Sequence, residues 1–182
     1  MLFFRNHNQI QHYIEAHRAQ LYRLAFAWCH NEQLAEDLVQ DTCIKALEKA
    51  GQLKDREKVA GWLTRIMLNL HRDCLRKQKD LVDIEDAGLA GNEAGPEQLA
   101  RQADTSAWVR SVIARLGEEQ RKVLTLVDLS DFSYSEVAAI MDIPIGTVMS
   151  RLCRARRQLK VLLEEEKQHS TNRTQPQLRR IK

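Results

Sequence analysis

The feature that most restricts the fold is a helical pattern near the C-terminus that is interrupted once and then resumed. It lies in the stretch YSEVAAIMDIPIGTVMSRLCRARRQL, residues 134–159. Pro144 lacks an N–H and disfavours helical backbone at the residue before it, so one helix should end near Asp142 and another should begin just after Pro144. Ser133 and Glu136 have the spacing of a capping box at the start of the first helix. Two short helices joined by a tight turn predict a helix-turn-helix.

The second helix of this pair has one apolar face and one basic face. Its apolar residues recur at steps that keep them on one side of a helix: Val148, Leu152, Ala155 and Leu159. The opposite face carries Gly146, Met149, Ser150, Cys153, Arg154 and Arg157, with Thr147 in the first turn. Residues 145–160 hold five basic side chains and no acidic one, whereas a merely solvated helix usually mixes both signs. The pattern favours a helix that enters the DNA major groove over an ordinary hairpin with a solvated arginine face.

Composition favours an all-α protein with one domain or two small ones. Aromatic residues make up only 5% of the 182 residues, Gly and Pro number 7 and 3, and apolar residues recur at helical spacing along most of the chain. No apolar run is long enough for a membrane span, and the start MLFFRNHNQ turns polar too soon for a signal peptide. We therefore expect no membrane insertion and a cytoplasmic location. The four cysteines are scattered without a CxxC pair, so we expect no cofactor and no metal site, with a zinc site at Cys29 and His30 as a minor alternative.

An uneven charge distribution marks the domain boundaries. Residues 79–105 hold 2 Lys or Arg against 7 Asp or Glu and contain three glycines and a proline, which is typical of a linker. The sequence therefore predicts two small helical domains joined by a flexible acidic linker, the C-terminal one containing the helix-turn-helix. The expected segments are a helical domain at 1–78, the linker at 79–105, the helix-turn-helix domain at 106–163 and a disordered basic tail at 164–182.

An acidic cluster lies on a helix predicted within residues 33–50. Its polar side carries Glu36, Asp37, Gln40 and Asp41. The cluster is either a solvated helix start or a docking patch for a basic partner surface. A catalytic or metal-binding role is the least favoured reading, because no histidine, distant ligand or glycine-rich loop accompanies the carboxylates. The buried side is expected to carry Leu34, Leu38, Thr42, Leu47 and either Ile44 or Val39.

A helix predicted over residues 59–79 is apolar on one side and basic on the other. The apolar side carries Trp62, Leu63, Ile66, Met67, Leu70 and Cys74. The other side carries Arg65, Asn69, Arg72, Arg76, Lys77 and Lys79, with Asp73 as the single acid. A basic stripe on a helix can follow phosphates, and an amide among the cations can read a base edge.

Three stretches together resemble a known family. They are AEDLVQDTCIKAL, GWLTRIMLNLHRDCLRK and LGEEQRKVLTLVDLSDFSYSEVAAIMDIPIGTVMSRLCRARRQL. In this order and spacing they resemble bacterial RNA polymerase sigma factors, and the short two-domain form resembles the extracytoplasmic-function group (group IV). The resemblance covers roughly residues 9–163.

The resemblance implies a role for each of the three clusters. Core RNA polymerase would bind the acidic cluster Glu36, Asp37, Gln40 and Asp41. The −10 promoter element would be bound and opened by Trp62, Arg65, Asn69, Arg72, Arg76 and Lys77. The −35 element would be read by Thr147, Met149, Ser150, Cys153, Arg154 and Arg157. On the flank of that last helix, Arg156 and Lys160 are expected to contact phosphate only.

The implied function is transcription initiation at the promoters of a specific regulon, with no enzymatic activity. Core polymerase and promoter DNA are the implied partners, and an anti-sigma factor is a further one. Met149 stands where the family often has Arg or Lys, and this departure removes one guanine or phosphate contact that the resemblance would otherwise imply. A free-standing helix-turn-helix regulator is the alternative, but it would leave the acidic cluster and residues 62–79 unexplained.

Overall fold

The computed structural model describes residues 2–53, 55–82 and 105–173, and these residues form helices and short connections without a strand. The all-α prediction is therefore confirmed. The N-terminal domain consists of α1 (Leu2–Cys29), α2 (Glu32–Glu48), the short 3₁₀ turn η1 (Ala50–Gln52) and α3 (Val59–Val82). None of the helices in the described ranges is both long and apolar enough to cross a membrane.

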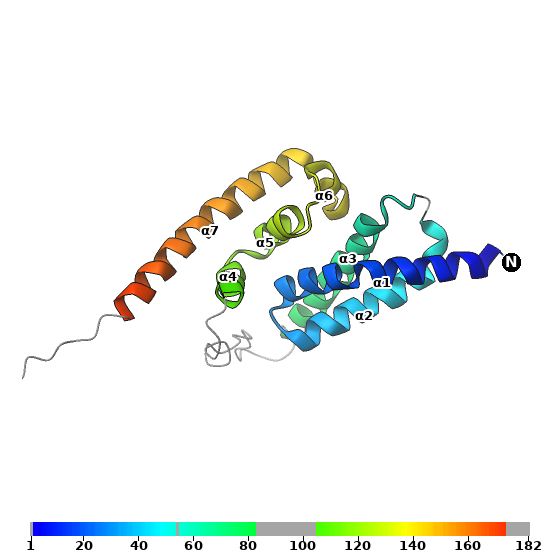
Figure 1. Ribbon diagram of the computed structural model, residues 1–182, viewed down its shortest axis with the longest axis horizontal. Helices are drawn as coiled ribbons and strands as arrows, with labels where there is room; N and C mark the ends of the chain where they lie inside the picture. The colour runs from blue at the N-terminus through cyan, green and yellow to red at the C-terminus, as the bar shows by residue number, and fades with distance from the viewer. Residues whose placement is uncertain (1, 54, 83–104, 174–182) are drawn as a thin grey trace, which may run out of the picture.

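The break between α1 and α2 follows from local backbone chemistry. His30 has a positive φ of 52°, which ends α1, and Asn31 caps α2 by accepting a hydrogen bond from the Leu34 amide at 3.0 Å. The two helices then run antiparallel, side by side (Figure 1).

The buried face of α2 differs in part from the prediction. Leu38 and Val39 are buried as expected, but Leu34 and Ile44 are 38% and 52% exposed. The core face of α2 is centred on Ala35, Leu38, Val39, Thr42 and Ala46, which leaves Leu34 and Ile44 on the solvent side.

The C-terminal domain consists of α4 (Thr105–Ala114), α5 (Glu118–Leu124), the π-helical turn η2 (Thr125–Leu129), α6 (Tyr134–Met141) and α7 (Ile145–Arg173). The predicted capping box is present, because Ser133 and Glu136 each accept a hydrogen bond from the other's backbone amide. Helix α6 ends at Asp142, which has a left-handed backbone with φ 58°. Helices α6 and α7 therefore form the predicted helix-turn-helix.

Helix α7 continues to Arg173, past residue 163 and into the segment that the sequence predicted to be disordered. Apart from Val161, residues 160–167 are good helix formers, and Glu165 pairs with Arg115 of the same domain at 3.3 Å. The tail beyond Arg173 and the greater part of the predicted linker, residues 83–104, lie outside the described residues.

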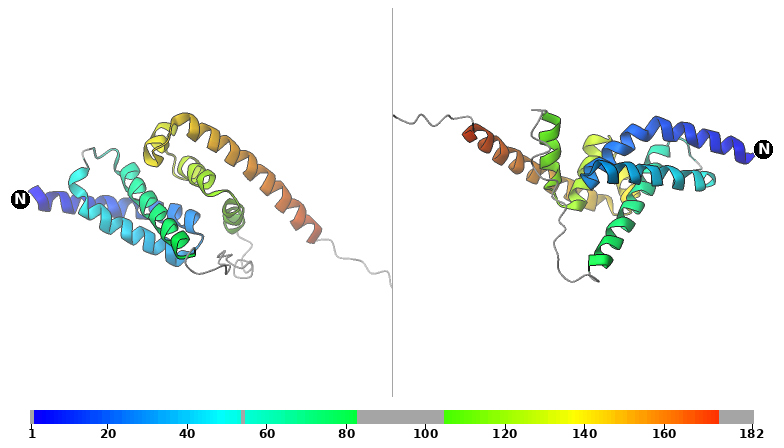
Figure 2. Two further views of the ribbon diagram at one scale, coloured as in Figure 1. Left: turned by 180° about the vertical axis from the view of Figure 1, so that it is seen from behind. Right: turned by 90° about the horizontal axis from the view of Figure 1, so that it is seen from below.

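The two domains pack against each other. Helix α3 contacts α6, and α1 contacts α4, α5 and η2, so segments far apart in the sequence lie side by side (Figures 1 and 2). The buried apolar residues of both domains form one continuous cluster. The sequence predicted two domains on a flexible linker and gave no indication of this contact.

Candidate functional site

The exposed face of α2 combines acidic and apolar side chains. Asp37, Gln40 and Asp41 are exposed, as predicted, and the helical repeat places them on the same side as Ile44 and Leu34. Glu36 is also exposed, but it lies about 100° from Asp37 around the helix, at the edge of this face. The sequence interpretation missed Leu34 and Ile44 on this face, because it assigned Leu34 to the core and kept Ile44 as an alternative to Val39 there.

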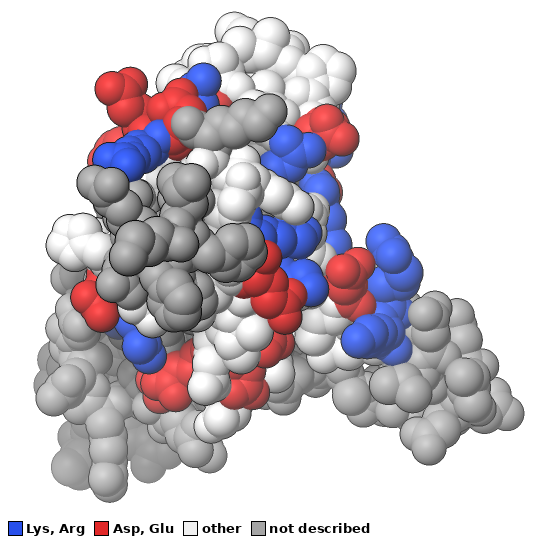
Figure 3. Space-filling model, turned by 90° about the vertical axis from the view of Figure 1, so that its right-hand side faces the viewer, with Lys and Arg blue, Asp and Glu red and all other residues white. Residues whose placement is uncertain are grey.

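The basic side of α3 is exposed along most of its length. Arg65, Asn69, Arg76 and Lys77 are exposed, and Trp62 is half-buried. Arg72 is the exception among the six candidates: its guanidinium donates a hydrogen bond to the Met141 carbonyl of the C-terminal domain at 3.2 Å. Figure 3 draws one face of the molecule. On it, Lys and Arg side chains gather in one area, and Asp and Glu side chains gather next to them.

The outward face of α7 presents most of the predicted −35 residues to solvent. Met149, Ser150, Cys153, Arg154 and Arg157 are exposed and Thr147 is half-buried. The Ser150 hydroxyl donates to the Thr147 carbonyl at 3.1 Å.

The arginines of α7 fall into two groups. Arg151 pairs with Glu119 at 2.5 Å, and Arg156 donates to both carboxylate oxygens of Asp128, at 2.5 and 3.2 Å. Asp128 raises the pKa of Arg156 through these hydrogen bonds. Arg154 and Arg157 form no ion pair with any residue that the structure describes. The first two arginines are therefore paired within their own domain, whereas the other two are exposed and carry no ion pair among the described residues.

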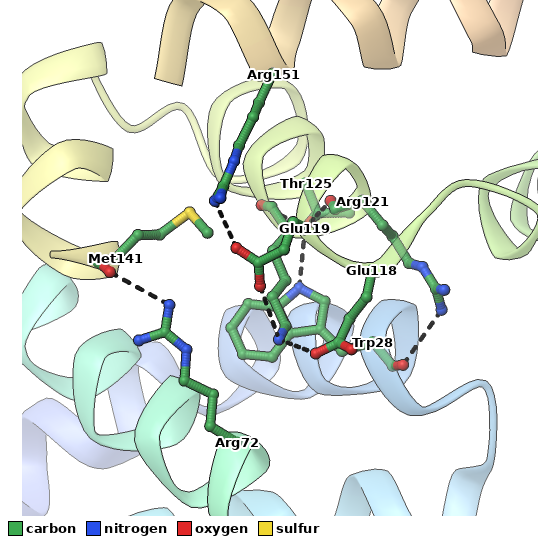
Figure 4. A network of polar contacts seen from close by, with 9 residues as sticks. Trp28, Arg72, Glu118, Glu119, Arg121, Thr125, Met141 and Arg151 are labelled. Atoms are coloured by element: carbon green, nitrogen blue, oxygen red, sulfur yellow. Dashed lines mark hydrogen bonds and ion pairs between the residues drawn. The ribbon is translucent and has the colours of Figure 1, made fainter. Parts of the chain in front are cut away.

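A network of polar contacts joins the N-terminal domain to the C-terminal domain (Figure 4). The Trp28 indole N–H donates to the Thr125 hydroxyl at 3.0 Å, and Arg121 donates to the Trp28 carbonyl at 3.4 Å. Lys122 is only 1% exposed and forms ion pairs with Glu118 and Glu119. A buried ammonium needs such partners, because an unpaired charge away from water is strongly destabilising.

Two histidines face this network and are held in the neutral form. Burial, and then the charge of Lys122, lowers the pKa of His71 from 6.5 to about 4. Burial, and then Arg121, lowers the pKa of His30 from 6.5 to about 4, and the neutral ring accepts a hydrogen bond from that guanidinium. The His71 ring packs on Trp28 with ring centroids 5.7 Å apart.

Acid is expected to destabilise the packed domains. Protonation of His71 is disfavoured beside Lys122, Arg121 and Arg72, and only Glu118 opposes this effect. The folded chain binds fewer protons than the unfolded chain, so acid lowers the free energy of unfolding. The contribution of neutral His71 is complete above about pH 6.5 and is lost as the pH falls toward 4. At pH 5 the free energy of unfolding should have fallen by about 2 kcal/mol. Urea unfolding at pH 7.5 and pH 5 measures this difference.

The matched control for this prediction is a pair of histidine variants. His71→Asn should reduce the difference between the two pH values, whereas His12→Asn, at an exposed position on α1, should retain it. An unchanged difference in His71→Asn would show that other groups cause the acid effect.

The described residues contain no group of three or more His, Cys, Asp or Glu side chains that could hold a metal ion. Cys29 and His30 adjoin the polar network, where burial and then Cys74 raise the pKa of the Cys29 thiol to about 11. A protonated thiol is a poor metal ligand.

Comparison with known proteins identifies both domains. The family model Sigma-70 region 2 matches residues 13–80, and the model Sigma-70, region 4 matches residues 106–159. The chain is 35% identical over 134 residues to the ECF RNA polymerase sigma factor EcfG of Rhodopseudomonas palustris, covering 73% of either chain. It is 32% identical over 149 residues to the ECF RNA polymerase sigma factor SigM of Mycobacterium tuberculosis, covering 81% of this chain and 73% of the relative.

Solved structures agree with these relatives. The sigma factor RpoE from Bartonella quintana, determined in complex with the anti-sigma factor NepR, matches with a TM-score of 0.75 and 29% identity, over 86% of this chain and 97% of that one. CnrH, determined with the cytosolic domain of CnrY, shares the fold with a TM-score of 0.65 at 23% identity. Both domains, their order and the sequence identity to curated relatives lead to one conclusion: the chain belongs to the ECF family of RNA polymerase sigma factors.

Proposed function

We propose that this chain binds core RNA polymerase through α2 and directs it to promoters through α3 and α7. The observation that carries the proposal is a set of exposed polar side chains on the two matched regions: Arg65 and Asn69 on α3, and Arg154 and Arg157 on α7. The three arginines have no ion-pair partner in the part of the chain that the structure describes. The chain itself would catalyse no reaction, since its proposed work is binding and positioning.

The exposed face of α2 suits a partner surface that is both basic and apolar. Asp37 and Asp41 supply negative charge, and Ile44 and Leu34 supply apolar area beside them. Charged groups give specificity and speed of association, while a central apolar contact contributes affinity. Ile44, which lies about one helical turn beyond Asp41 on this face, is therefore the proposed main apolar contact with the polymerase.

Helix α3 has the composition needed to hold an opened −10 strand. Arg65 and Arg76 can contact phosphates, Asn69 can bond a base edge, and half-buried Trp62 offers a ring on which a base can stack. Lys77 extends the basic stripe toward the end of the helix.

Arg154 is proposed to read a base of the −35 element. It lies on the outward face of α7 beside Ser150, whereas Lys160 lies further along the helix, on its flank. Arg154→Ala is expected to relax preference at one −35 position by about 1–3 kcal/mol, whereas Lys160→Ala should weaken binding to all sequences alike. Promoter profiling with a randomised −35 element separates the two effects. Unaltered base preferences in Arg154→Ala, at uniformly lower output, would contradict the assignment.

The structure changes the role proposed for Arg156, which the sequence interpretation expected to contact phosphate. Because both oxygens of Asp128 accept from its guanidinium, we propose that it supports the fold of the domain and contributes little to phosphate binding.

An anti-sigma factor is a proposed third partner. The structure of the Bartonella relative was determined in complex with an anti-sigma factor, and the structural match covers 97% of the length of that relative.

Purified chain with core RNA polymerase tests the proposed function. Transcription of genomic DNA in vitro, followed by sequencing of the transcript ends, should show starts at a defined set of promoters only when the chain is added. A free-standing regulator would bind DNA tightly without polymerase and give no new starts, and that outcome would overturn the proposal.

A further inference from the structure

We propose that Ile145, Met149 and Cys153 form an apolar strip on α7 that reads thymine methyl groups in the −35 element. The strip rests on the proposed function of α7 and deepens it, because it names the base chemistry that one edge of this helix recognises. It also gives a role to Met149, which stands where the resemblance implies a basic side chain.

The three side chains of the apolar strip follow one another along the first turns of α7. Ile145 and Met149 are 49% and 53% exposed, and Cys153 is also exposed. Residues four apart on a helix are neighbours, displaced by about 40° around the axis and about 6 Å along it. The three side chains therefore lie in one row, outside the buried face that Val148 and Leu152 form.

The exposed half of α7 thus has two edges of different chemistry. Ser150 and Arg154 lie toward one edge, and the apolar strip lies along the other. Gly146 lies between the two edges, and a Cβ built there would meet no atom within 4 Å. Because a glycine carries no side chain, a ligand can approach the helix backbone closely at this point.

The dimensions of DNA bring both edges of α7 into contact with the same groove. A helix with its side chains is about 10–12 Å across, and the major groove of B-DNA is about 12 Å wide. The first residues of a recognition helix are the ones that reach base edges, and Ile145 and Met149 lie in the first two turns of α7. A groove that Arg154 enters therefore also receives the apolar strip.

Thymine is the base that this strip suits. Its methyl group is the apolar group that base pairs present in the major groove, whereas guanine, adenine and cytosine present hydrogen-bonding atoms there. Contact with the methyl group removes apolar surface from water. Hydrogen-bonding atoms covered by Ile145 and Met149 would instead lose their bonds to water without replacement. The strip should favour A·T pairs with the thymine facing it.

Deoxyuridine isolates this contact from all others. It pairs with adenine as thymidine does and lacks only the methyl group. Burial of one methyl group is expected to change the dissociation constant about fourfold.

The test uses holoenzyme assembled from the full chain and core RNA polymerase. A −35 element is first selected from a randomised pool. Each thymine in it, on either strand, is then replaced singly by deoxyuridine in an otherwise unchanged fluorescent duplex. Dissociation constants are measured by anisotropy for the wild type, for Met149→Ala and for the control Val161→Ala. Val161 is similarly exposed, at 48%, but lies about 18 Å further along α7.

The wild type and Val161→Ala are expected to bind about fourfold more weakly when deoxyuridine replaces a thymine that faces the strip. Met149→Ala should bind the thymine and deoxyuridine forms of at least one such position equally well. In the randomised pool, Met149→Arg should exchange the A·T preference at that position for guanine. Should Met149→Ala lose helical circular dichroism, Met149→Gln, which keeps the length of the side chain, decides instead.

Three results would overturn the proposal: a selected −35 element without an A·T pair, no effect of any deoxyuridine, or undiminished deoxyuridine sensitivity in Met149→Ala. If Met149→Ala weakens assembly with core polymerase and deoxyuridine has no effect, the strip is a protein contact and the proposal is wrong.

Failure of the proposed function gives a different pattern. The wild-type holoenzyme would then select no −35 element, and the strip proposal would fall with it. Failure of the strip alone leaves the selection and its dependence on Arg154 intact.

Discussion

Replacing Asp37 and Asp41 together by Lys is expected to weaken binding to core RNA polymerase by roughly 30- to 1000-fold, since reversing charge against a complementary surface costs about 2–4 kcal/mol in total. Both side chains are exposed and neither belongs to the core face of α2, so the helix should keep its fold. Binding is measured with labelled core polymerase, and folding by circular dichroism.

Two variants make this experiment specific. Glu15→Lys with Glu164→Lys carries the same change in net charge at exposed positions on α1 and α7 and should leave polymerase binding near the wild-type level. Glu36→Lys should have a smaller effect than Asp37→Lys, because Glu36 lies at the edge of the α2 face. Equal losses in the double variant and in the Glu15, Glu164 control would mean that net charge alone matters, and the docking face would be wrong.

The parts of the fold that depend on local chemistry could be predicted from the sequence. Pro144 ends one helix and precedes the next, Ser133 and Glu136 form the capping box, and Asn31 caps α2. Each of these features is decided by hydrogen bonds and backbone preferences within a few residues. The break between α6 and α7 followed from Pro144 and the capping box.

Contacts between residues far apart in the chain could not be predicted from the sequence. The Arg156–Asp128 and Arg72–Met141 contacts join residues far apart in the chain, and helical periodicity carries no information about such partners. Lys122 has the sequence signature of a surface residue, yet it is 1% exposed because Glu118 and Glu119 compensate its charge at the domain interface.

Exposed apolar residues are a second reason why the predicted core of α2 differs from the core in the structure. Ile44 was an alternative to Val39 in the predicted core of α2, because the two lie on opposite flanks of Leu38 around the helix. The structure buries Val39 and leaves Ile44 52% exposed. Helical periodicity cannot tell an exposed apolar residue from a buried one when both lie near the boundary of the core face.

Replacing Leu152 with Asp is expected to unfold the C-terminal domain. Leu152 is 2% exposed and lies between Val148 and Ala155, both 0% exposed, on the inner face of α7. Burying a carboxylate there, without a partner, costs more than about 4 kcal/mol, and a domain of this size has about that much stability to lose. Limited proteolysis should then cut residues 106–173 rapidly and α1 to α3 more slowly, because these three helices also pack against one another. Cys153→Asp places the same charge one residue away on the exposed face, so it should keep the domain resistant to protease and weaken only DNA binding. Equal resistance in Leu152→Asp and Cys153→Asp would show that the inner face of α7 is not a core, and the assignment of its opposite face to DNA would fail with it.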